Sequence, residues 1–128
     1  MKLTVITPDA TLLSEEVTSI NIAEKNGSYT ILKDHAPLIT VVKEIVATIN
    51  TKTSDLKYIA ANAGTLKVLG NTATLIIDYG IAGTSKDDAR QKLQSLRDTI
   101  AKTIDNTGDK TIANIEFEIM RRMKEMRQ

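Results

Sequence analysis

Apolar and polar residues alternate over short segments in the first part of the chain, from Lys2 to Asp78. Alternation of this kind places every second side chain on the same face of a β-strand. The segments are rich in Val, Ile, Thr and Tyr, and turn-forming pairs such as Asn26-Gly27 and Gly70-Asn71 separate them. We therefore expect about ten short strands, arranged as an antiparallel β-sandwich or a flattened barrel. The strand-like segments are KLTVIT, VTSINIAE, SYTIL, LITVV, IVATINT, DLKYIA, TLKVLG and TATLIID.

The pattern changes after the segment Gly80 to Thr84, and apolar residues then recur every three or four positions. This spacing predicts two amphipathic helices. Ser85, followed three residues later by Asp88, indicates a helix N-terminus, and Asn106-Thr107-Gly108 indicates its end. The short connection favours an antiparallel hairpin. The two apolar stripes are Ala89, Leu93, Leu96, Ile100 and Ile104, then Ile112, Ile115, Ile119, Met123 and Met126.

These patterns predict an α+β protein with two parts. Residues 1–84 form an N-terminal antiparallel β-sandwich domain, and residues 85–128 form a C-terminal two-helix hairpin. The hairpin has too few apolar side chains to be stable alone, so it needs a second surface to pack against. If two such surfaces are available, the hairpin can act as a movable arm.

Composition excludes several classes of function. The chain has 128 residues, no cysteine and a net charge of +1, which argues against thiolate metal sites and against a nucleic-acid partner. No apolar run is long enough to cross a membrane. The strand-like KLTVIT follows Met1 directly, without a signal segment, so we expect the chain to remain in the compartment where it is made.

Residues that could carry chemistry are few. His35 is the only histidine, and without cysteines or clustered carboxylates it fits a structural or interface role better than a metal ligand or general base. Asp87 and Asp88 point about 100° apart on a helix, which favours capping over a catalytic carboxylate pair. Because the sequence shows no nucleophile–base pair, metal cluster or phosphate loop, we expect neither an enzyme nor a metal protein.

The end of the chain is both basic and rich in methionine. The methionines Met120, Met123 and Met126 suit the core of the hairpin, or else an adaptable docking surface. The basic residues suit the C-terminus of a helix, or else an acidic partner. These basic residues are Arg121, Arg122, Lys124 and Arg127.

Two stretches of the chain are distinctive: NGSYTILKDHAPL, residues 26–38, and KLTVITPDATLL near the start. The first resembles the GxxGxLxxHAPL motif of the epsilon subunit of F-type ATP synthases, and the second resembles that family's first strand with the V-x-T-P turn. AGTLKV, residues 63–68, is similar to G-G-x-L-x-V, and a helical hairpin follows at the matching place. The chain departs from the family at Ser28, Thr30 and Lys33-Asp34, where Glu, Gly and Pro-Gly are frequent.

The resemblance implies a non-catalytic rotor subunit in the central stalk, which couples proton- or sodium-driven rotation to ATP synthesis. The implied partners are the gamma subunit, the ring of c subunits and the alpha/beta catalytic hexamer, which the helical arm meets when it inhibits ATP hydrolysis. The implied location is peripheral, on the cytoplasmic face of the bacterial plasma membrane. Contacts to gamma and the rotor ring are assigned to Ser28, Tyr29, Lys33, Asp34, His35, Ala36, Pro37 and Leu38, and contacts to the catalytic head to Arg121, Arg122, Lys124 and Arg127.

Some bacterial members of this family bind ATP through the motif Leu/Ile-Asp-x-x-Arg-Ala. The chain has Lys86-Asp87-Asp88-Ala89-Arg90-Gln91 at this place, so Asp87 and Arg90 match and the two ends of the motif do not. The resemblance therefore implies regulatory ATP at Asp87 and Arg90, and no other cofactor. From the residues alone, Arg90 reads as a solvated helix residue, and the whole chain also fits a freestanding β-sandwich ligand-binding module with a helical dimerisation tail.

Overall fold

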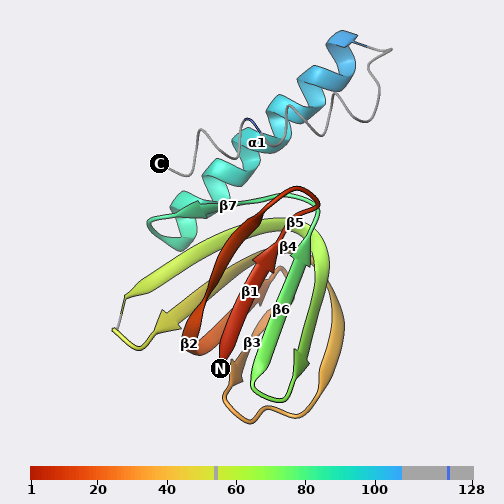
Figure 1. Cartoon of the computed structure of the whole chain (residues 1–128). Coiled ribbons are helices and arrows are strands. Elements are labelled where there is room, and N and C mark those ends of the chain that lie inside the picture. The colour runs from red at the N-terminus through yellow and green to blue at the C-terminus, as the bar shows by residue number, and fades with distance from the viewer. Residues whose placement is uncertain (54, 108–120, 122–128) are drawn as a thin grey trace.

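The computed structural model describes residues 1–53, 55–107 and 121, and contains seven strands and one long helix in that part of the chain (Figure 1). The helix, α1, confirms the first of the two predicted helices. The bounds are β1 (Lys2–Ile6), β2 (Thr11–Glu24), β3 (Gly27–Leu32), β4 (Leu38–Thr51), β5 (Leu56–Leu69), β6 (Thr72–Ile77), β7 (Gly80–Gly83) and α1 (Lys86–Thr107).

The strand pairings close into a ring. Strand β1 lies between β2 and β6, and the ring continues from β6 through β5 and β4 back to β2. Strand β3 extends the sheet along β2, while β7 pairs with β5. The result is the expected β-sandwich, built as a flattened barrel, but one pairing differs from the prediction: β1 runs parallel to β6, with Leu3 beside Ala73.

The prediction of about ten short strands is wrong for the described residues, because β2, β4 and β5 each span 14 residues. The segments LITVV and IVATINT form a single strand, since Lys43-Glu44 is not a turn. Lys43 pairs with Ala63 and Ile45 with Ala61, while Glu44 takes a left-handed φ of 51° without leaving the strand. The register with β5 is the same on both sides of Glu44, so the unusual backbone angle does not interrupt the ladder.

The barrel interior is filled by branched aliphatic side chains, as a sequence poor in aromatic residues requires. Leu66 and Leu75 are fully buried there and face each other across β5 and β6. Gly64 lies at a point where these two strands approach closely, because a Cβ atom at Gly64 would overlap the backbone oxygen of Ile76. This close approach explains why the AGTLKV segment has a glycine at position 64.

Helix α1 packs on the outside of the barrel and buries a second, separate apolar cluster. The helix lies across β7, β5 and β4, as Figure 1 shows. Small residues allow this close approach: Gly83 has no room for a Cβ atom because the backbone of Ala89 lies against it. The second cluster consists of Val46, Ala60, Ile81, Ala89 and Leu93, with Tyr58 and Tyr79 at its margin.

The second helix of the predicted hairpin lies outside the described residues, except for Arg121, which is helical and exposed. No helix in the described part of the chain has the length and apolar character needed to span a membrane.

Candidate functional site

The first turn of α1 is fixed by reciprocal hydrogen bonds. The backbone N–H of Asp88 donates to Ser85 Oγ at 3.0 Å, which confirms the predicted cap. The Asp88 carboxylate in turn accepts from the backbone N–H of Thr84 at 2.8 Å and pairs with Lys92 at 3.1 Å. The bonds satisfy backbone donors that would otherwise be unpaired at the start of the helix. Asp88 therefore has a capping role.

We expect the contribution of Asp88 to helix stability to disappear in acid. The backbone hydrogen bond from Thr84, followed by that from Lys92, holds the pKa of Asp88 below its ordinary value of 3.8. Because the folded-state pKa is lowered, this stabilisation is fully present above the ordinary value and is lost as pH falls through the lowered pKa. An acid titration followed by far-UV circular dichroism should show a helix loss that the Asp88→Asn variant lacks. Identical titrations of the two proteins would contradict this expectation.

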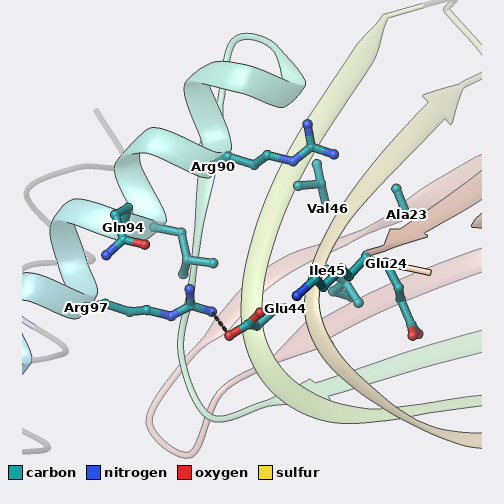
Figure 2. A pocket seen from close by; sticks show the side chains of 10 residues that line it. Ala23, Glu24, Glu44, Ile45, Val46, Arg90, Gln94 and Arg97 are labelled. Carbon is teal, nitrogen blue, oxygen red and sulfur yellow. Dashed lines mark ion pairs between the residues drawn. The ribbon is translucent and has the colours of Figure 1, made fainter. Parts of the chain in front are cut away.

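A cavity of about 420 Å³ lies between α1 and the sheet (Figure 2). Its volume is within the usual range of small-molecule sites. Arg90 and Arg97 extend from the helix toward β4, while Ile45, Val46 and Leu93 give the cavity an apolar side. The remaining lining residues are Ala23, Glu24, Lys25, Glu44 and Gln94.

Asp87 and Arg90, the two residues that match the nucleotide motif, differ in where they lie. Arg90 lines the cavity, but Asp87 is not among its lining residues and is 88% exposed. Their charged groups form an ion pair at 3.6 Å along the first turns of α1. An exposed pair of this kind contributes little to stability, so Arg90 can exchange Asp87 for another anion without a large loss.

Arg97 is a cavity residue that the sequence reasoning missed. Its side chain is 25% exposed, and its guanidinium lies 3.6 Å from the carboxylate of Glu44 on β4. Its Nε donates to Asn62 Oδ1 on β5 at 3.1 Å. The signal available in the sequence was the spacing of seven residues, two helical turns, which places Arg97 on the same face as Arg90.

The outer face of β4, β5 and β6 carries large apolar side chains that are exposed in the described part of the chain, between polar residues such as Thr65 and Lys67. Ile39 and Val41 on β4 are 72% and 77% exposed, and Leu69 on β5 and Ile76 on β6 are 58% and 50% exposed. The register places Val41, Thr65 and Ile76 side by side across the three strands. Several large exposed apolar side chains on one sheet face are typical of an interaction surface. We refer to Ile39, Val41, Leu69 and Ile76 as the apolar face.

The loop between β3 and β4 leads directly into the apolar face. The backbone N–H of His35 donates to Leu32 O at 3.1 Å, and Asp34 has a φ of 66°. The His35 ring approaches its neighbour's backbone, with Nδ1 at 2.7 Å from Ala36 O. Of the residues implied to contact partners, Ser28, Lys33, Asp34, Ala36 and Pro37 are exposed and His35 is half-exposed.

Tyr29 and Leu38, which were grouped with that loop, instead pack partly against the barrel interior. Burial, followed by the charge of Glu24, raises the pKa of the Tyr29 hydroxyl. Arg121 is exposed, while Arg122, Lys124 and Arg127 lie outside the described residues.

Another cavity, of about 570 Å³, lies beside the short edge strand β7. Its walls are mainly apolar, with Leu12, Leu13, Leu56 and Ile81 among them, and Lys57 is the one charged side chain among the described residues that line it. Over residues 1–53 and 55–107, no three acidic or histidine side chains are grouped so that they could hold a metal ion.

Comparison with known proteins adds to these features. The sequence profile of the family described as "ATP synthase, Delta/Epsilon chain, beta-sandwich domain" matches residues 1–82. An ATP synthase epsilon chain from Nitratiruptor is 24% identical over 126 residues, which cover 97% of this chain and 96% of the relative. An ATP synthase epsilon chain from Clostridium perfringens is 30% identical over 89 residues, covering 70% of this chain and 67% of the relative.

Two solved structures share the fold. A chain in the central stalk and c-ring structure of Tetrahymena thermophila mitochondrial ATP synthase gives a TM-score of 0.54 at 19% identity, covering 63% of this chain and 65% of that one. A chain in the Euglena gracilis mitochondrial ATP synthase gives a TM-score of 0.60 at 17% identity, covering 96% of this chain and 76% of that one. At these identities the likeness concerns the fold.

Proposed function

The chain belongs to the epsilon-subunit family of F-type ATP synthases, and we propose on that basis that it is a non-catalytic subunit of the central stalk. In this role it couples ion-driven rotation to ATP synthesis, and its C-terminal arm inhibits ATP hydrolysis. The observation that carries the proposal is the family match over residues 1–82, which is the whole barrel up to β7.

The apolar face supports docking of the barrel onto the gamma subunit. Ile39 and Val41 are more than two-thirds exposed, and both lie in the first part of β4, where the strand pairs with β5. Burial of such side chains against a partner contributes roughly 1.5–3 kcal/mol each. A torque-carrying contact must not slip, and a rigid β-sheet face meets that requirement better than a loop does.

The loop at residues 33–37 is suited to a neighbouring contact with the ring of c subunits. It joins the apolar face at Leu38, where β4 begins, so one side of the barrel presents both surfaces. The exposed Lys33 and Asp34 offer polar contacts there. A subunit bound in this way is peripheral to the membrane, and in a bacterium it lies on the cytoplasmic face of the plasma membrane.

The arm, residues 85–128, is proposed as the regulatory part. Its first helix packs on a cluster that is separate from the barrel interior, so α1 can leave the sheet without opening the barrel. The basic residues Arg121, Arg122, Lys124 and Arg127 are proposed to meet acidic groups of the alpha/beta hexamer when the arm is extended.

The proposal is tested by affinity purification of the tagged chain from lysate of the source cells. The expected result is recovery of the gamma, alpha, beta and c subunits in constant proportion, and no ATPase activity in the isolated chain. Recovery of the tagged chain without any ATP synthase subunit would contradict the assignment.

Regulatory ATP is proposed at the cavity between α1 and the sheet. Arg90 and Arg97 present two cations to one space, and paired guanidinium groups are well suited to phosphate groups. Val46 and Leu93 supply an apolar side against which a nucleobase can pack. Asp87, which pairs with Arg90, is then the group that holds Arg90 in the empty site.

Isothermal titration calorimetry of the full-length chain with ATP checks this proposal. We expect saturable binding, and we expect Arg90→Ala to weaken it by roughly tenfold or more, the loss that a charge-assisted hydrogen bond to phosphate accounts for. The matched control is Lys102→Ala, which removes a positive charge from an exposed position on the same helix, away from the cavity. Absence of binding heat, or equal weakening by both substitutions, would rule out this nucleotide site.

A further inference from the structure

Arg97 joins the helix to two neighbouring strands through polar contacts. Its Nε donates to Asn62 Oδ1 on β5 at 3.1 Å, and its Nη2 lies 3.6 Å from Glu44 Oε1 on β4 (Figure 2). The guanidinium also faces the Tyr79 hydroxyl: burial raises the pKa of Tyr79, and Arg97 counters part of that rise. A single side chain of α1 thus contacts two residues beneath the helix and influences the pKa of a third.

The acceptor for Arg97 is itself held in place. Asn62 Nδ2 donates to Asp78 Oδ2 at 2.7 Å, so the Asn62 amide oxygen is turned toward the helix. The other oxygen of Asp78 accepts from the backbone N–H groups of Ala63 at 3.0 Å and Tyr79 at 2.7 Å. These bonds link the helix through Arg97 and Asn62 to the backbone of the barrel. The bonds among Asn62, Asp78 and the backbone do not involve the helix, so they orient the acceptor for Arg97 in advance.

Glu44 lies on β4 with an unusual backbone conformation. Its φ of 51° lies in the left-handed region, which a residue with a side chain rarely occupies. A strained conformation of this kind persists where surrounding structure enforces it, and it clusters at positions with a role. From this position on β4, two residues before Val46 of the apolar cluster, the Glu44 carboxylate lies 3.6 Å from the Arg97 guanidinium.

We propose that Arg97, Asn62, Asp78 and Glu44 form a polar latch that sets how often α1 leaves the barrel. The described part of the sheet contributes three buried residues to the apolar contact under the helix, Val46, Ala60 and Ile81, and Tyr58 and Tyr79 pack at its margin. The latch residues add a polar attachment to this apolar contact. The latch is built entirely from residues of this chain.

Thiol-labelling kinetics on the full-length chain can measure this departure directly. The chain has no cysteine, so one introduced thiol reports one position. Val46 is 3% exposed and lies beneath α1, whereas Val42, on the same strand, is 1% exposed inside the barrel. Val46→Cys therefore reacts with a thiol reagent when α1 lifts off, and Val42→Cys reacts when the barrel opens.

The latch predicts that Arg97→Gln accelerates labelling at position 46 by roughly tenfold and leaves the rate at position 42 unchanged. Glu44→Gln and Asn62→Ala should each accelerate labelling at position 46, and each should add little once Arg97→Gln is present. Arg97→Lys keeps the charge without the planar fork and should fall between wild type and Arg97→Gln. Lys102→Gln, which removes one charge from an exposed position on α1, should leave both rates unchanged.

Three outcomes would overturn the latch. Equal acceleration at positions 42 and 46 would mean that Arg97 stabilises the whole barrel. An unchanged rate at position 46 in Arg97→Gln would mean that the apolar cluster alone holds the helix. Equal rates at the two positions in the chain without latch substitutions would mean that α1 leaves only when the barrel unfolds.

Discussion

Replacing Val41 by Asp should weaken assembly of the chain with its rotor partners by roughly 100-fold. Val41 is 77% exposed in the isolated chain, so the substitution should spare folding. In the proposed complex the same position is covered by the gamma subunit, and burying an unpaired carboxylate there costs on the order of 3 kcal/mol or more. The binding affinity of purified variants for the rest of the central stalk, measured by surface plasmon resonance, checks this expectation.

Leu56→Asp is the matched control for that experiment. Leu56 is also a strand residue with a large exposed side chain, at 49%, but it lies outside the apolar face and beside the other cavity. This variant should bind the stalk about as well as the unsubstituted chain. Equal loss of binding in the two variants would show that negative charge itself, and not the position on the apolar face, weakens assembly.

Removing the arm should raise ATP hydrolysis by the assembled complex while assembly is kept. The barrel interior does not depend on α1, because the helix buries only the separate outer cluster. Deletion of residues 85–128 removes the part proposed to block the catalytic head. An increase in hydrolysis on the order of tenfold corresponds to a loss of about 1.4 kcal/mol in the free energy of the inhibitory contact. Steady-state ATPase assays on complexes reconstituted with each form of the subunit provide the measurement.

A full-length variant distinguishes the effect of the positive charges of the arm from the effect of deleting the arm. Deletion exposes Val46, Ala60 and Ile81 on the barrel surface, which could disturb assembly for unrelated reasons. Replacing Arg121, Arg122, Lys124 and Arg127 together by Gln keeps the first helix and its contacts. If inhibition requires these cations, this variant should match the deletion. Hydrolysis at the unsubstituted level in both would remove the inhibitory role.

Local sequence signals were sufficient for the start of α1. Ser85 and Asp88 make the capping bonds that their spacing indicated, and Ala89 and Leu93 face the sheet as their period requires. These features depend on residues three or four positions apart, so the sequence contains all of the information. The reciprocal bond differs in one detail, since Asp88 accepts from Thr84 and not from Ser85.

Strand boundaries were harder to predict, because they depend on pairing partners far away in the chain. Lys43-Glu44 interrupts an apolar run and reads as a turn, yet pairing with Ala61 and Ala63 keeps it within β4. The parallel pairing of β1 with β6 has no local signal at all, since it joins residues about 70 positions apart. Tertiary contacts of this kind override local pattern.

The residues of the candidate site also differ in whether a local sequence signal or a distant partner in the chain identifies them. Arg90 could be found from a motif, but Arg97 acts through Asn62 and Glu44, which lie 35 and 53 positions earlier in the chain.

The sequence contained one signal for the apolar face that the sequence analysis did not use. In LITVV, the side chains on both faces of the strand are largely apolar. An antiparallel strand that is apolar on both faces needs a second partner surface. The apolar side chains on both faces of LITVV are therefore enough, by themselves, to indicate an interaction surface at Ile39 and Val41.

The position of β1 between β2 and β6 sets an order for events during protein synthesis. Strand β1 leaves the ribosome before β6, so one edge of β1 stays unpaired until Thr72 to Ile77 have followed. Ring closure must therefore wait for more than half of the chain to be translated, and pairing across such a distance slows folding. A nascent chain paused before β6 would carry an open strand edge, which is the kind of surface that chaperones protect.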